Sequence, residues 1–164
     1  MVEEKIRALI DEKLKEELYS DCFFVEMLLK GDKRLEIYLD SDSGITFQQC
    51  QRMSRHIEAV LDEEKWFGEK YTLEVSSPGI GKPLKLHRQY LKNIGRDLEV
   101  RVDGEKPVVG ELIDVKEEEF TVTREEKFKE GKKNVKKMVE YMHSTFRESV
   151  LIAYHNEICS IQIM

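Results

Sequence analysis

The sequence contains few of the residues that build disulfide frameworks and metal sites. Its 164 residues include three cysteines and four histidines. Cys22, Cys50 and Cys159 lie far apart and within apolar patterns, so we expect buried free thiols and neither a disulfide framework nor a zinc site. The histidines have no paired spacing and no neighbouring cysteine, so they offer no ligand pattern. We expect no metal and no other cofactor.

Long apolar runs are also missing. No stretch approaches the roughly 20 apolar residues that a membrane helix needs. Residues 1–18 are acidic and amphipathic, which does not match a secretory signal. The composition, 40% hydrophobic and 37% charged, is typical of a soluble globular protein. We therefore expect a cytoplasmic monomer that does not contact a membrane.

No catalytic motif can be found. The Gly-x-Gly-Lys run at residues 79–82 resembles a phosphate-binding loop, but Ser76 and Pro83 stand where such a loop needs Gly and Ser or Thr. Ser76 and Ser77 lack the Gly-x-Ser-x-Gly context of a nucleophile elbow. We expect a protein that is not an enzyme, although an active site assembled from scattered residues would escape this test.

Charge is distributed unequally along the chain. The net charge is -6, which opposes binding through a broad basic surface on nucleic acid. Residues 1–82 hold 12 Lys and Arg against 18 Asp and Glu, whereas residues 83–164 hold 15 of each. The first half suits a basic protein partner, and the second half could face RNA through local patches.

The first half of the chain predicts a small α/β domain. Helical and alternating apolar spacings indicate a helix, two strands, a helix and a strand, at residues 3–18, 22–29, 35–39, 46–60 and 71–75. Gly31 and Asp32 suit a tight hairpin, and Thr46 with Gln49 forms a capping box. A three-stranded sheet with both helices on one side would bury all the apolar stripes together.

The second half predicts a short helix at residues 86–94 followed by a small β-barrel. Strand-like runs occur at residues 98–102, 108–115, 120–124, 138–142, 150–154 and 158–163. Residues 125–137 are charged throughout and predict a mobile loop. Seven basic residues at this loop are candidate phosphate contacts, namely Arg124, Lys127, Lys129, Lys132, Lys133, Lys136 and Lys137. An ordinary solvated loop explains them equally well.

A turn-rich connector joins the halves. It comprises Ser76, Ser77, Pro78, Gly79, Lys82 and Pro83, whose prolines and glycines restrict the backbone and permit tight turns. The run Leu73-Glu74-Val75-Ser76-Ser77-Pro78-Gly79, with Pro83-Leu84 and Ile94-Gly95-Arg96 after it, closely resembles the RimP family of ribosome maturation factors. Gly44-Ile45-Thr46 and Val60-Leu61-Asp62 extend the resemblance upstream. Gly81 and Lys82 depart from the acidic residue and Arg that the family usually has.

The resemblance implies a fold and a function. It implies an α+β protein, with an N-terminal α-β-β-α-β domain of KH-like topology at residues 1–82 and a C-terminal SH3-like or Sm-like β-barrel at residues 83–164. It implies a non-catalytic factor that binds the free small (30S) ribosomal subunit through a basic ribosomal protein, and the local basic patches of the second half add an expected contact with ribosomal RNA. The connector is then expected to set the relative orientation of the domains. The sequence lacks the Gly-x-x-Gly loop with which KH domains clamp nucleic acid.

A general RNA-binding regulator built on an Sm-like barrel is the alternative. Such a protein would bind isolated RNA strongly and stack bases on aromatic side chains. The aromatic content of 9% and the acidic balance count against it.

Overall fold

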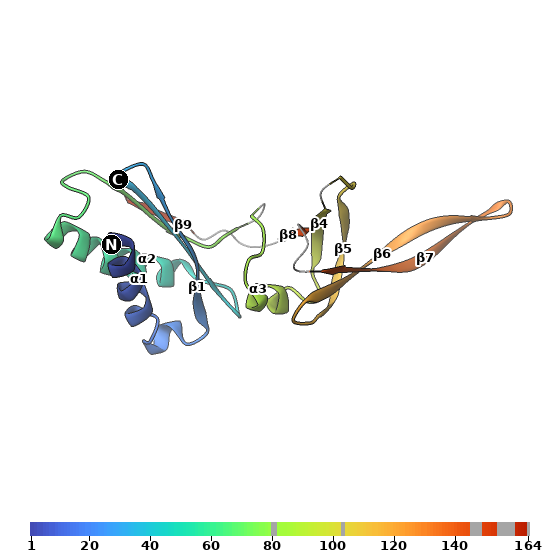
Figure 1. Ribbon diagram of the computed structural model, residues 1–164. Helices are drawn as coiled ribbons and strands as arrows, with labels where there is room; N and C mark the ends of the chain where they lie inside the picture. The colour runs from blue at the N-terminus through green and yellow to red at the C-terminus, as the bar shows by residue number, and fades with distance from the viewer. Residues whose placement is uncertain (80–81, 103, 145–148, 154–159, 164) are drawn as a thin grey trace. The chain divides into compact units, whose positions relative to one another are not determined.

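The structure, a computed structural model, describes residues 1–79, 82–102, 104–144, 149–153 and 160–163. Three α-helices and two β-sheets confirm a mixed α+β protein (Figure 1). Two compact units are present, Met1–Gly79 with Glu157–Met164, and Ile80–Asn156. Their boundary falls between Gly79 and Ile80, inside the connector, whereas the sequence placed it after residue 82. None of the helices in the described ranges is long and apolar enough to cross a membrane.

The first unit has the predicted order of elements. These are α1 (Val2–Lys13), β1 (Cys22–Lys30), β2 (Arg34–Ser41), α2 (Phe47–Glu64) and β3 (Thr72–Ser76). The predicted first helix is too long, because a short 3-10 turn η1 (Glu17–Tyr19) replaces its last part. β1 and β2 form an antiparallel hairpin, and α2 is the crossover that lets β3 run parallel to β2.

Both ends of α2 are defined by local chemistry. The capping box is confirmed at the N-terminus, where the Gln49 amide donates to Thr46 Oγ1 at 3.2 Å and the Thr46 amide donates to Gln49 Oε1 at 2.8 Å. At the C-terminus Lys65 adopts a left-handed conformation with φ of 54°. The free thiols expected at Cys22 and Cys50 are buried, and Cys159 lies outside the described residues.

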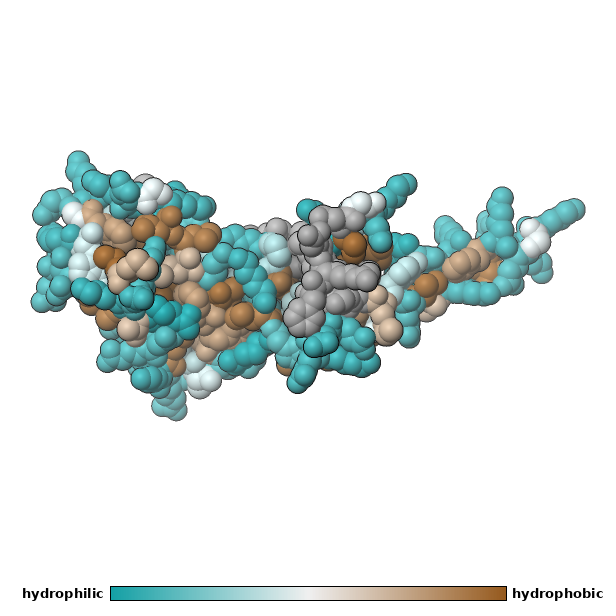
Figure 2. Space-filling model, viewed as in Figure 1, coloured by the Kyte–Doolittle hydropathy of each residue, from teal (hydrophilic) through white to brown (hydrophobic). Residues whose placement is uncertain are grey.

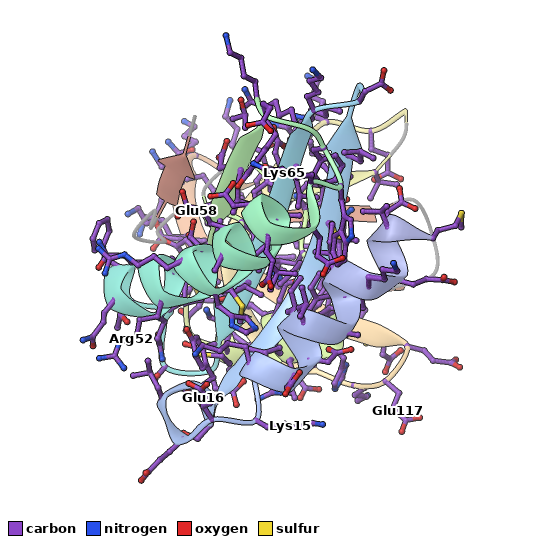
Figure 3. All side chains as sticks on the ribbon, turned by 90° about the vertical axis from the view of Figure 1, so that its left-hand side faces the viewer. Lys15, Glu16, Arg52, Glu58, Lys65 and Glu117 are labelled. Carbon is purple, nitrogen blue, oxygen red and sulfur yellow. The ribbon has the colours of Figure 1, made fainter. Side chains whose placement is uncertain are left out.

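The core of the first unit lies between one face of the sheet and the two helices. Alternate residues of β2 and β3 face the helices, and Leu35 pairs with Leu73 as Ile37 pairs with Val75. Figure 3 shows α1 and α2 on the same side of the sheet. The helices contribute fully buried side chains to the same cluster, among them Ile6, Ile10, Met53, Ile57 and Leu61. Each such side chain stabilises the fold by about 1.5–3 kcal/mol.

A fourth strand corrects the predicted three-stranded sheet. β9 (Ser160–Ile163) pairs antiparallel with β3, from Leu73↔Ile163 to Ser76↔Ser160, and the sheet order is β1-β2-β3-β9. The sequence assigned this last strand to the second domain because it follows the other C-terminal strands. β3 would otherwise be an edge strand with unpaired backbone groups, and β9 satisfies them.

Among its described residues the second unit has one α-helix and one five-stranded sheet. Its elements are α3 (His87–Lys92), β4 (Asp97–Val102), β5 (Val108–Val115), β6 (Glu119–Glu130), β7 (Lys133–Ser144) and β8 (Ser149–Ala153). The sheet order is β7-β6-β5-β4-β8, with antiparallel neighbours. A small core of Leu84, Tyr90, Leu98, Val100, Leu112, Phe120 and Val122 lies beside it.

Two expectations for the second unit differ from the structure. Residues 125–137, predicted as a mobile loop, are strand residues of β6 and β7 apart from the turn at Gly131 and Lys132. Pairing across the hairpin runs without interruption from Glu119↔Ser144 to Glu130↔Lys133 and satisfies the backbone of this charged segment. Within the described ranges the sheet is open, since no pairing joins β7 to β8.

Candidate functional site

The β6–β7 hairpin extends beyond the sheet that carries it. β5 pairs with β6 only from Val115↔Phe120 to Glu111↔Thr123. Beyond Thr123 the two strands pair with each other alone in the part of the chain that the structure describes. We call residues 124–139 the basic ribbon. It brings together all seven predicted contact residues, Arg124, Lys127, Lys129, Lys132, Lys133, Lys136 and Lys137.

The turn end of the basic ribbon concentrates positive charge. Residues 127–137 include six lysines and one glutamate, a balance of +5 within a chain whose net charge is -6. Figure 2 shows hydrophilic side chains at this end, with more apolar ones in the strands behind it. The sign of this segment is therefore opposite to that of the whole chain.

Three of the seven basic residues are held by carboxylates of the ribbon itself. Lys136 Nζ lies 2.9 Å from Glu125 Oε1, and Lys137 pairs with Glu130. Arg124 Nε donates to Glu126 Oε1 at 2.7 Å, and its guanidinium lies over the Tyr141 ring. Hydrogen bonds from Tyr141 and then Arg124 lower the pKa of Glu126. These contacts span both strands and stabilise the ribbon.

The other four, Lys127, Lys129, Lys132 and Lys133, have no ion-pair or hydrogen-bond partner for their side chains among the described residues. Lys127 and Lys129 lie on one face of the ribbon, since strand residues two apart share a face. Phe128 lies on the other face, opposite Val135. Lys132 lies in the turn, and Lys133, the first residue of β7, lies opposite Glu130 on the same face as Phe128. The structure thus divides the predicted set into three residues with carboxylate partners and four without such a partner among the described residues.

The connector begins at the end of β3 and is partly buried. Ser76 and Ser77 are 3% and 8% exposed. Gly79 has φ of 68°, a left-handed conformation that confirms the need for glycine there. Lys82 and Pro83 follow, while Ile80 and Gly81 lie outside the described residues.

A charged cluster around the buried side chain of Glu36 in the first unit was missed by the sequence analysis. Glu36, 2% exposed, accepts hydrogen bonds from Lys30, Arg34 and Tyr38, and Arg34 also binds Glu74 at 3.1 Å. Burial alone would raise the pKa of Glu36, but the bonds from Lys30, Arg34 and Tyr38 outweigh it and lower that pKa to about 2. The signal was the alternation of Arg34, Glu36 and Tyr38 with the apolar residues of β2.

Known proteins match most of the chain. The chain is 33% identical over 153 residues to ribosome maturation factor RimP of Flavobacterium psychrophilum, covering 91% of this chain and 96% of that protein. The chain belongs to the RimP family. Ribosome maturation factor RimP of Chlorobium limicola is 38% identical over 160 residues, covering 86% of this chain and 91% of the relative. The RimP N-terminal domain matches residues 5–81, so it spans the first unit through β3 and the connector up to Gly81.

Membership of the RimP family confirms the resemblance drawn from the connector. The matched RimP N-terminal domain ends before β4, so the basic ribbon lies outside it. A third RimP protein, from Christiangramia forsetii, is 36% identical over 106 residues, covering 65% of this chain and 66% of its own.

Proposed function

We propose that this protein is a non-catalytic assembly factor that binds the free small ribosomal subunit during its maturation. The observation that carries the proposal is the match over about nine-tenths of the chain to proteins named ribosome maturation factor RimP. The protein acts in the cytoplasm as a monomer. Its partners are a basic ribosomal protein and, through the basic ribbon, ribosomal RNA.

The finer fold assignment belongs to the same proposal. The α-β-β-α-β order of the first unit supports a KH-like domain, with β9 as an addition to its sheet. The antiparallel strands of the second unit support an SH3-like domain in which β6 and β7 are extended. The connector Ser76, Ser77, Pro78, Gly79, Lys82 and Pro83 links the two domains.

Sedimentation of the tagged protein through a ribosome gradient tests the function. We expect the protein with free small subunits and little of it on translating ribosomes. Equal abundance on translating ribosomes, or absence from every ribosomal fraction, would contradict the proposal.

A general RNA-binding regulator is the second candidate, and the charge of the basic ribbon is the observation that favours it. The two functions differ in their affinity for unrelated RNA. Since the net charge of -6 opposes nonspecific phosphate attraction, we expect weak binding to bulk RNA at physiological salt. Submicromolar affinity in a filter-binding titration would favour the regulator.

A further inference from the structure

We propose that Lys127, Lys129, Lys132 and Lys133 form a docking surface for the phosphate backbone of double-helical RNA, whereas Arg124, Lys136 and Lys137 hold the ribbon in shape. The division follows from the ion pairs. The second set is bound to Glu126, Glu125 and Glu130, while the first set has no such partner within the described ranges. We call the first set the four free lysines.

The register of the ribbon supplies an independent argument. Lys127 lies directly opposite Lys136, and like charges in this position destabilise a strand pair. Glu125 compensates Lys136, which leaves Lys127 without a counter-charge. A two-stranded ribbon is only marginally stable by itself. A bound polyanion would offset the repulsion between Lys127 and Lys136.

The chemistry of the surface favours an RNA backbone over other polyanions. Lysine offers a point charge on a flexible stem, which suits phosphate contacts and reads no base sequence. Lys127 and Lys129 repeat at about 7 Å along one face of β6. The neighbouring aromatic residue Phe128 lies on the face opposite Lys127 and Lys129, so these two lysines have no ring beside them on which unpaired bases could stack, whereas Lys133 lies at the end of the face of Phe128. Paired RNA that displays its phosphates therefore fits better than single strands.

A fourfold lysine-to-glutamine variant of the free lysines tests the inference. The matched control changes four exposed lysines outside the ribbon, Lys15, Lys33, Lys70 and Lys106, so that both variants lose the same charge. The probe is a fluorescent RNA duplex of unrelated sequence, titrated between 50 and 200 mM salt. For a protein that makes four phosphate contacts, raising the salt concentration over this range weakens binding by roughly two orders of magnitude. We expect this salt dependence for the parent and the control, and its near-complete loss in the variant.

The second part of the experiment measures binding to small subunits, and its interpretation rests on the proposed function. We expect the variant to bind subunits more weakly and with a salt slope reduced by about 3.6. If the parent binds subunits and the variant binds them with the same slope, the inference fails and the proposed function stands. If the parent binds no subunits, the proposed function fails and the duplex titration still decides the inference. Weakened subunit binding without any effect on the duplex indicates an acidic protein partner and overturns the RNA assignment.

Discussion

Tyr19 and Gln49 join the 3-10 turn to the start of α2 through two hydrogen bonds. The Tyr19 hydroxyl donates to the Gln49 carbonyl at 2.9 Å, and Gln49 Nε2 donates back to the Leu18 carbonyl at 2.8 Å. Gln49 Oε1 also accepts from the Thr46 amide. A single buried amide therefore completes the helix cap and fixes the preceding turn.

Replacing Gln49 with Ala should lower the free energy of unfolding by about 1–3 kcal/mol, because it leaves buried backbone groups without partners. Tyr19→Phe, which removes one hydrogen bond and keeps the ring, should cost about 1 kcal/mol. Urea unfolding followed by circular dichroism measures both. The exposed neighbour Gln48→Ala is the control, and a loss as large in this control would contradict the assigned role of Gln49.

Glu36 should make stability depend on pH in the acid range. Its pKa is lowered to about 2 in the folded state, so its contribution is complete above its ordinary value of 4.5 and is lost as pH falls toward 2. We expect Glu36→Gln to reduce the free energy of unfolding at pH 7 by about 1–2 kcal/mol, a figure limited by the solvent-exposed ends of Lys30 and Arg34. Urea titrations at pH 7, 4 and 3 should show that the difference in free energy of unfolding between the parent and Glu36→Gln shrinks as the pH falls. The exposed Glu117→Gln serves as control, and a constant difference across pH would argue against the cluster.

Lys65→Gly should stabilise the protein by about 0.5–1 kcal/mol, because glycine adopts the left-handed conformation at the end of α2 without steric cost. Lys65 has φ of 54° and is the one residue other than glycine with positive φ among those described. Glu63→Gly, inside the same helix, should have the opposite effect and destabilise the protein. Thermal unfolding compares the two variants, and destabilisation by both would mean that the Lys65 side chain contributes more than its backbone costs.

Gly79→Val should impair small-subunit binding more than Gly81→Asp. A β-branched residue is strained at the Gly79 φ of 68°, so the variant must change the path of the connector. Gly81→Asp restores the residue type usual in the family, at a position outside the described residues. Sedimentation with purified subunits measures binding, after circular dichroism has shown that both variants fold. If Gly79→Val binds subunits as well as the parent does while Gly81→Asp does not, the connector does not have the proposed role in recognition.

The sequence predicted the local features of the fold well, because those depend on neighbouring residues. The alternation at Leu35, Ile37 and Leu39 and the cap at Thr46 both appear in the structure as expected. Residues 125–137 were misassigned because a dense run of charges masks the strand pattern, which here comes from pairing across a tight turn and not from burial. The basic residues of the candidate site were identified from composition, but their division into paired and free lysines requires the register of β6 against β7.

The position of β9 has a consequence for biosynthesis. β3 ends at Ser76 and its partner β9 ends at Ile163, so 87 residues must be added before the first sheet is complete. At the usual rate of synthesis this takes about 4–17 s. During that interval β3 exposes the backbone groups of an edge strand, which are a template for aggregation. Chains that terminate before residue 160 would keep this edge permanently and should depend on chaperones that the full chain needs only briefly.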